Sequence, residues 1–417
     1  GPGRPGRRGG PGNRRVLYRS KLTARRRDQF GFQADGPFLI PGLYDGRNKT
    51  FFFFSEEVRR IIRGQADAAA TVPTAAQRGL NGGPFDLSSL LGAPITSGGA
   101  PVLVTDTNGN TIQVRQNQVF RPSDNRAYAG NIIPRSDVDP RSIALLGAVP
   151  LPNSPTNPNG FTFSQVGIQN TRQETIRIDH IFNDKHSLFG RYTHDLSETA
   201  EPLGLFGVGL PGVQNSETRV PGQVVAISHT ALLSPTMVNE ATFNFSSNLI
   251  ASEVVGRSRR SDYPGASAIT EIFPENNNDV VPRINGVGFG LGGSGSTLTL
   301  LGATQGFGIA YKNYLVRDVV TWTKGNHTLK FGGEMSFEKK GENGSNNTQG
   351  TFTFSATQSQ GFSSGTTAIG TTGLSFGSFL LGRASTYDEA ERDVVLNLRF
   401  GRREFFAQDT WKVRSNL

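Results

Sequence analysis

Apolar and polar residues alternate with a period of two in several stretches of the chain. In 240–246, Ala241, Phe243 and Phe245 alternate with polar residues, and 403–413 repeats the pattern up to Trp411 and Val413. The same alternation occupies 175–182, 188–195, 224–232, 313–323 and 329–337. A period of two indicates β-strands with one apolar and one polar face. Together with an N-terminal hairpin near 28–62, it predicts an all-β protein of about nine strands.

The N-terminal hairpin contains a run of four aromatic residues. A polar turn at 47–50 leads into Phe51, Phe52, Phe53 and Phe54, and 29–38 is the predicted partner strand. Aromatic runs favour strands. Four consecutive Phe place rings on both faces, which fits a doubly covered core strand or a strand end in the aromatic girdle of a membrane barrel. The run alone does not decide between these two interpretations.

The connections between strands alternate between short and long. Short ones fall near 39–50, 183–186, 234–236 and 324–327, and long ones near 63–170, 196–223, 251–310 and 340–400. A meander with this order has all short turns at one end. That layout is typical of outer-membrane barrels, which have brief periplasmic turns and long extracellular loops. It predicts an antiparallel transmembrane β-barrel with extracellular loops at the four long connections, and we expect short helices near 142–146 and 376–382 within them.

The positive charge of the chain is concentrated in its first 28 residues. The chain has 43 Lys and Arg, 34 Asp and Glu, and a net charge of +9. Residues 1–28 hold ten of the bases and one of the acids, so the remainder is neutral. We expect this basic Gly/Arg/Pro tail to be disordered or foreign to the rest of the protein. It lacks interleaved aromatic residues, so no nucleic-acid partner is expected.

No constellation of residues indicates catalysis or a cofactor. The chain has no Cys, which excludes disulfides and thiolate metal sites. His180, His186 and His194 lack the spacing of metal ligands. The letters of Gly288-x-Gly290-x-x-Gly293 match a dinucleotide fingerprint, but no strand and helix flank them, so we interpret them as loop glycines. The sequence predicts no enzyme, no catalytic residues, no cofactor and no metal.

Four charged residues fall on the polar side of two predicted strands. Arg177, Asp179, Arg191 and Asp195 alternate with apolar residues such as Ile178. In a barrel they should face the lumen. The sequence leaves open whether they contact another part of the protein or form a generic hydrated face.

Short motifs occur in a characteristic order from residue 29 to the C-terminus. They are Gly36-Pro37, Lys49–Phe54 with Glu57, Val72–Arg78, Ile133-Pro134, Asp139-Pro140, Pro150–Asn153, Arg177–His180, Phe182–Tyr192, Asn239-Glu240, His327–Glu334, Phe379–Gly382 and Phe406–Trp411. In this order the chain resembles TonB-dependent outer-membrane receptors, particularly the large type with an N-terminal carboxypeptidase-regulatory-like domain. Asp35 departs from the family pattern, which usually has Gly there.

The resemblance implies a fold, a location and a function. Plugged barrels of this kind have about 22 strands, so we expect residues 29–417 to form about the first half of one, as a fragment without plug, TonB box or closing strand. It implies TonB-energised uptake of a scarce ligand across the bacterial outer membrane. The expected partners are outer-membrane lipid, the TonB complex in the full-length protein, and a siderophore, oligosaccharide or peptide.

Two further expectations depend on this interpretation. With loop parity, it places Phe51, Phe52, Phe53, Phe54 and Trp411 at the membrane interface. The alternative function is a secreted or surface β-rich adhesin or glycan-binding protein with no role in the membrane.

Overall fold

The computed structural model describes most of the chain. The described residues are 25–64, 68–163, 166–201, 214–256, 259–276, 279–288, 306–344, 347–364 and 366–414. The first 24 residues of the basic tail and Gly290 and Gly293 of the glycine motif lie outside them. Among the described residues, no helix is long and apolar enough to cross a membrane.

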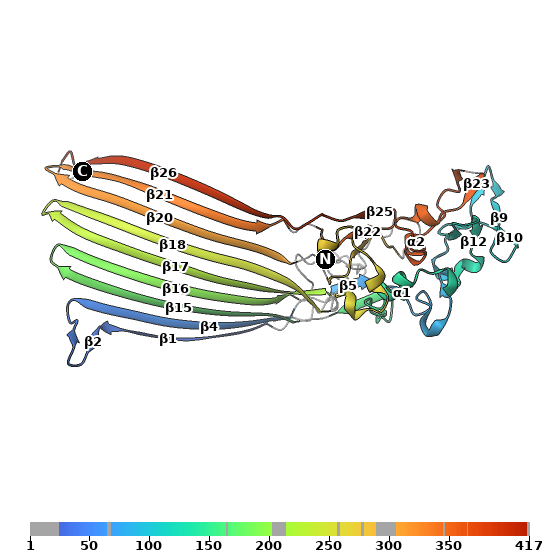
Figure 1. Cartoon of the computed structure of the whole chain (residues 1–417), viewed down its shortest axis with the longest axis horizontal. Helices are drawn as coiled ribbons and strands as arrows, with labels where there is room; N and C mark the ends of the chain where they lie inside the picture. Colours follow the sequence, from blue (N-terminus) through green and yellow to red (C-terminus); the bar gives the residue numbers. More distant parts are fainter. Residues whose placement is uncertain are drawn as a thin grey trace, which may run out of the picture.

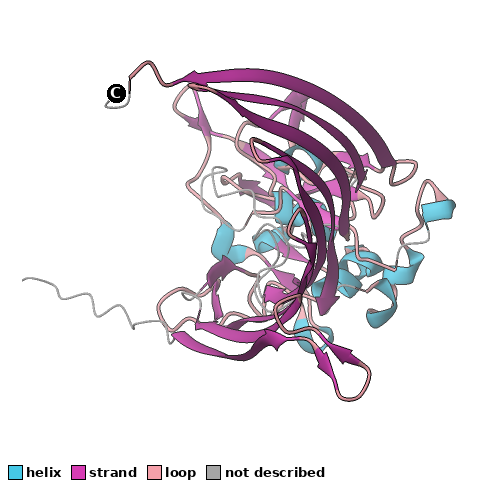
Figure 2. Cartoon of the chain, turned by 90° about the vertical axis from the view of Figure 1, so that its left-hand side faces the viewer, coloured by secondary structure: helices cyan, strands magenta, loops and turns pink. Residues whose placement is uncertain are grey.

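A nine-stranded antiparallel sheet dominates the protein (Figure 1). Its strands, in sheet order, are β1 (Arg25–Pro37), β4 (Thr50–Gly64), β15 (Val166–Asn183), β16 (His186–Glu201), β17 (Gln214–Ser234), β18 (Met237–Gly256), β20 (Phe307–Lys324), β21 (His327–Asn343) and β26 (Val395–Trp411). The sheet is strongly curved, and β1 and β26 are its two edges, so it does not close (Figure 2). The all-β antiparallel fold predicted from period-two alternation is confirmed.

The strand register sorts the side chains onto two different faces. Residues directly opposite each other point to the same side of a sheet. Ile178 pairs with Phe52 and Gly190, and further along the same row Phe243 pairs with Ile227 and Val316. We call this side the apolar face. Ile178, Val316 and Phe337 on it are 47%, 53% and 51% exposed, an arrangement that requires an apolar surrounding or a partner.

The apolar face has the height of a membrane. On β21 it extends from His327, which pairs with Trp411, to Phe337. The ten steps between these two residues rise about 33 Å along the strand at ~3.3 Å each. With the strand tilt of about 40° found in membrane barrels, this corresponds to about 25 Å, the height of their apolar band.

Several strands are longer than the alternation predicted. The expected loop at 196–223 is largely strand, because β16 runs to Glu201 and β17 begins at Gln214. The expected tail 1–28 ends early, because β1 begins at Arg25. These extensions, such as 196–201, carry polar residues on both sides, so their sequence shows no alternation. A strand that continues beyond an apolar environment meets water on both faces and loses the pattern on which the prediction depended.

The remaining elements are short and lie at the far end of the sheet from the short turns, except β2 and β3, which form a small hairpin in the first turn (Figure 1). The helices are α1 (Pro140–Leu146) and α2 (Ser375–Leu380), close to their predicted positions. The short strands are β2 (Leu39–Ile40), β3 (Tyr44–Asp45), β5 (Ala68–Thr71), β6 (Phe85–Asp86), β7 (Thr96–Ser97), β8 (Ala100–Pro101), β9 (Leu103–Thr105), β10 (Thr111–Gln113), β11 (Phe120–Arg121), β12 (Arg126–Ala127), β13 (Ile132–Ile133), β14 (Gly160–Phe163), β19 (Arg283–Asn285), β22 (Thr351–Thr353), β23 (Phe362–Ser364), β24 (Thr367–Ala368) and β25 (Thr386–Asp388).

Three long connections share one hydrophobic core, and we call them together the loop module. Its parts are the connections β4–β15, β18–β20 and β21–β26. Tyr128 and Phe85 from the first, Ile284 from the second and Phe376 and Phe379 from the third are all fully buried in one cluster. The short strand β22 also pairs with β19 of the second connection and β25 of the third. The sequence predicted long connections at these positions, and the structure shows that these three pack together around one core.

Candidate functional site: two faces of the sheet and the loop module

The four charged residues predicted for the lumen all lie on the face opposite the apolar one, which we call the polar face. Arg177 pairs directly with Arg191 across β15 and β16, and Asp179 and Asp195 have the same parity on these strands. Ile178, between Arg177 and Asp179, points to the apolar face. The register therefore brings the four side chains to one side, while the assignment of that side to a lumen stays a proposal.

Arg177 and Asp179 form a bidentate pair along β15. The Nε and Nη2 groups of Arg177 donate to the Asp179 carboxylate at 2.8 and 2.7 Å. The guanidinium also lies 4.4 Å from the ring centroid of Phe189, which pairs with Asp179 on β16. Two parallel hydrogen bonds and a cation–π contact hold the Arg177 side chain in one orientation.

Asp195 is not part of this pair, and the position of its side chain requires a glycine on the neighbouring strand. It is directly opposite Gly222 on β17. A Cβ atom added at Gly222 would lie 2.4 Å from Asp195 Oδ1. The carboxylate therefore occupies the space that any side chain at 222 would need.

The aromatic residues predicted for the membrane interface divide between the faces. Phe52 and Phe54 lie on the apolar face, whereas Phe51 and Phe53 pair with Asp179 and Arg177 on the polar face. This division is the geometric consequence of placing consecutive residues in a strand. The interface proposal is therefore kept for Phe52 and Phe54 on the apolar face.

Trp411 lies on the apolar face at the end of the sheet with the short turns. It is 60% exposed and stacks on His327, with ring centroids 5.5 Å apart and planes 7° apart. The second Trp of the chain, Trp322, lies on the same face nearby, with Lys324 Nζ 5.1 Å from its ring centroid. Both Trp residues therefore mark one border of the apolar face, where aromatic belts occur in membrane proteins.

The other border carries a row of aromatic residues that the sequence did not reveal. It consists of Phe54, Tyr192, Phe245, Tyr314 and Phe337, on five strands of the sheet. The ring centroids of Phe245 and Tyr314 lie 5.0 Å apart. The alternation of each strand gave its face, but only the pairing register aligns these residues in one row.

The next row along the strands is charged. Arg172 Nε lies 2.9 Å from a carboxylate oxygen of Glu56 and 2.6 Å from one of Glu174. His194 Nδ1 lies 2.9 Å from the other oxygen of Glu174. All four side chains are on the apolar side of the sheet. They mark where the apolar face ends, and on these strands the acidic side chains have basic partners within the chain.

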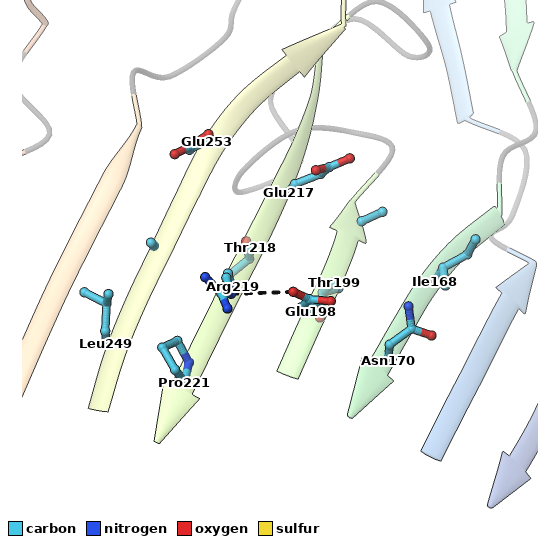
Figure 3. Close-up of a pocket in the computed structure, with 12 residues that line it drawn as sticks. Ile168, Asn170, Glu198, Thr199, Glu217, Thr218, Arg219, Pro221, Leu249 and Glu253 are labelled. Atoms are coloured by element: carbon cyan, nitrogen blue, oxygen red, sulfur yellow. Dashed lines mark ion pairs between the residues drawn. The ribbon is translucent and has the colours of Figure 1, made fainter. Parts of the chain in front are cut away.

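A hollow of about 570 Å³ lies beyond this border, over β15 to β18 (Figure 3). Most of its lining residues, all except Thr199 and Thr218, have the parity of the apolar face, so it opens on the side opposite Arg177 and Asp179. Arg219 and Glu198 form an ion pair across it at 3.5 Å. Glu217 and Glu253 are directly opposite each other on β17 and β18. The hollow therefore does not include the predicted lumen residues.

Within the loop module, Asp139 joins two connections. Its side chain accepts from the backbone N–H of Arg141 at 2.8 Å and caps α1, and its backbone N–H donates to the carbonyl of Leu380. Hydrogen bonds from the Arg141 guanidinium hold the pKa of the Asp139 carboxyl below its usual value, against the opposing effect of burial. A cavity of about 110 Å³ lies between the three connections beside these residues, lined in part by Ile284 and Phe379.

Glu389 ties the second and third connections together. Its carboxylate accepts from the backbone N–H of Ile272 at 2.7 Å, from Asn276 Nδ2 at 2.9 Å and from the Tyr387 hydroxyl at 2.6 Å. Burial and the neighbouring Glu389 raise the pKa of Tyr387. These bonds, like those of Asp139, fasten the loops to one another.

Histidines approach one another at one point of the sheet. His186 Nδ1 and His229 Nε2 lie 3.3 Å apart in stacked rings. Within the described ranges, no group of three or more His, Cys, Asp or Glu side chains could hold a metal ion. The two rings are packed side chains of neighbouring strands.

Comparison with known proteins identifies the family. The family model described as an outer membrane beta barrel domain matches residues 14–417. No curated protein sequence matches the chain. Two similar solved structures come from Escherichia coli. The outer membrane transporter YddB has a TM-score of 0.42 at 7% identity, and the match covers 93% of this chain and 32% of YddB.

The second is the open form of the ferric-catecholate import receptor Fiu of strain K12. It has a TM-score of 0.34 at 8% identity, and the match covers 95% of this chain and 46% of Fiu. The chain thus spans less than half the length of either transporter. The family match covers nearly the whole chain and agrees with the two-faced antiparallel sheet: the protein belongs to the outer membrane beta-barrel domain family and is a protein of the bacterial outer membrane.

Proposed function

We propose that the chain forms part of the wall and the outer cap of a TonB-energised receptor that takes up a scarce small ligand. The observation that carries the proposal is the combination of a membrane-high apolar face with an ordered module built from the long connections alone. The family match supports the membrane part. The uptake, the TonB complex as partner and the class of ligand (siderophore, oligosaccharide or peptide) are proposals.

The geometry suits a ligand-capturing cap. The loop module has its own core, to which all three long connections contribute, so its surface is preorganised. Preorganised loops lose less conformational entropy when a ligand binds. The fixed Arg177–Asp179 pair and Phe189 on the polar face would then line the lumen, where a plug or ligand passes.

Cysteine labelling tests the orientation, because the chain has no Cys of its own. Leu103→Cys in β9 of the loop module and Leu43→Cys in the short turn near β2 both replace exposed residues. In intact cells, a membrane-impermeant maleimide should label position 103 and not position 43. Both should react after the outer membrane is permeabilised. Labelling of position 43 alone in intact cells would show that the orientation is the opposite of the one proposed.

An uptake experiment tests the transport. Strains with and without the full-length protein are compared for growth on limiting siderophore, oligosaccharide, peptide or cobalamin-like ligands. The proposal expects one class to require the protein and an intact TonB complex. Uptake that persists without TonB would contradict it. Adhesion or glycan binding without uptake of any ligand would also contradict the proposal and would favour an adhesin, although one located in the outer membrane and not the protein without a membrane role that the sequence left as the alternative.

A further inference from the structure

Three cations lie directly opposite one another on the apolar side of the sheet. Lys312 of β20 pairs with Lys339 of β21, which pairs with Arg399 of β26. We call them the basic row. All three side chains are exposed. Directly opposite residues have Cβ atoms about 5 Å apart, and like charges in that position destabilise a sheet.

The residues that the structure describes provide no counter-charge for the basic row. Neighbours on this face include Ser247, Tyr314, Phe337 and Gly401, and none is acidic. The nearby carboxylates of Glu334 and Glu342 point to the polar face, where they pair with Arg402 and Lys340. In the described part of the chain, none of the three cations has an ion-pair partner. Arg403, on the same face of β26, adds a fourth positive charge.

On β4 and β15 the same row carries acidic residues. There Glu56 lies directly opposite Glu174, and Arg172 forms ion pairs with both carboxylates and offsets part of their charge. Like charges at this border of the apolar face thus have an oppositely charged partner within the chain on β4 and β15. At Lys312, Lys339 and Arg399 the described residues supply no such ion-pair partner.

The position of the basic row limits what the anion can be. Tyr314 and Phe337 lie one row below it, at the upper border of the apolar face. A molecule that contacts both the basic row and the apolar face would have its phosphate groups at the basic row and its apolar chains on the apolar face. Clusters of Lys and Arg beside a membrane recognise anionic lipid head groups. A phosphate monoester, with a charge near −2, matches three clustered cations better than a singly charged phosphodiester.

We propose that the basic row binds the phosphates of an acylated, bisphosphorylated glucosamine disaccharide of the lipid A type, whose acyl chains lie along the apolar face. The choice of leaflet rests on the proposed outward orientation of the loop module. The predicted contact is independent of uptake, since it lies on the opposite side of the sheet from the polar face.

The test removes the charges in the full-length protein, purified from outer membranes in mild detergent. The triple variant K312Q/K339Q/R399Q is compared with R317Q/K340Q/R402Q, which removes three cations from the polar face of the same three strands. Retained lipid is counted by native mass spectrometry. The basic-row variant should lose glycolipid affinity by about fivefold per cation, and the polar-face variant should retain it. The charge-preserving K312R/K339R variant should also retain it, which separates charge from folding.

Competition with other lipids tests which chemical groups of the glycolipid the basic row recognises. The bisphosphorylated disaccharide should bind, whereas its dephosphorylated form and phosphatidylglycerol should bind weakly, and millimolar inorganic phosphate should not displace it. Equal loss in both triple variants, equal retention of phosphatidylglycerol, or displacement by free phosphate would overturn the proposal. Labelling of positions 103 and 43 in the same preparations shows separately whether the proposed orientation has failed.

Discussion

The backbone N–H of Asp139 donates to the carbonyl oxygen of Leu380 at 2.8 Å, and so links the first long connection to the third. Beside it, the Ser142 hydroxyl donates to the Phe379 carbonyl at 2.5 Å. Asp139 is the N-cap of α1 and Leu380 is the last residue of α2, so the two helices are fastened end to end. The module should therefore open as a unit when either helix is disturbed.

Phe379→Ala should open the loop module without disturbing the sheet. Phe379 is fully buried and packs edge-on against Phe354, with ring centroids 5.3 Å apart. Removing a buried Phe side chain costs about 3–5 kcal/mol. Limited proteolysis should then cut all three long connections at similar rates. Leu151→Ala, at a 44% exposed position of the first connection, is the control and should leave the pattern unchanged. Cleavage confined to the third connection would contradict a shared core.

Gly382→Ala should destabilise the module through a collision as well as through the backbone. Gly382 has a φ of +65°, and a Cβ there would lie 2.4 Å from Asp139 Oδ2. Gly42, in a short turn, has a φ of +73° and nothing within 4 Å of its Cβ position. Gly42→Ala thus measures the backbone cost alone, about 1 kcal/mol. Hydrogen exchange should show a larger loss of protection in the module of Gly382→Ala than near the turn of Gly42→Ala. Equal effects would mean that Asp139 moves aside freely.

The strands of the sheet were predicted correctly because the alternation within each strand shows which of its residues share a face. Ile178 between Arg177 and Asp179, and Phe243 between polar neighbours, gave the right strands and sides without any knowledge of pairing. The aromatic row and the basic row were missed, because Tyr314 meets Phe245, and Lys312 meets Lys339, only through the register. Register is a property of two strands together, and a single strand does not contain it.

The loop module was missed for a different reason. Its core residues, such as Phe85, Ile284 and Phe376, stand singly among Gly, Ser and Asn, with no helical or strand period. The sequence motifs Asp139-Pro140 and Phe379–Gly382 both lie in this module, and in the structure they contact each other. Contacts between distant, irregular segments leave no local pattern from which to predict them.

Acid should weaken the loop module through Asp139. Its folded pKa lies below the ordinary value of about 4. The carboxylate therefore stabilises the folded module above that pH, and the contribution is lost as the pH falls through the folded pKa. Protease resistance of the module should decline below about pH 4 in the wild type. Asp139→Asn should be less resistant at neutral pH and show a smaller change on acidification. An identical pH profile for the two proteins would show that Asp139 does not cause the loss of protease resistance in acid.

A lysine scan along β18 should distinguish the two faces of the sheet. Phe243 lies on the apolar face between Ile227 and Val316, whereas Asn244 lies on the polar face between Ala226 and Leu315. A lysine facing lipid near the middle of the bilayer costs about 2–4 kcal/mol, and one facing a hydrated lumen costs much less. In the full-length protein, Phe243→Lys should reduce the folded, heat-modifiable fraction in outer membranes, whereas Asn244→Lys should leave it near the wild-type level. Because the two positions are adjacent on one strand, depth and local register are matched and only the direction of the side chain differs. Equal loss in both variants would mean that the two faces meet similar surroundings, which a barrel wall with lipid on one side does not allow.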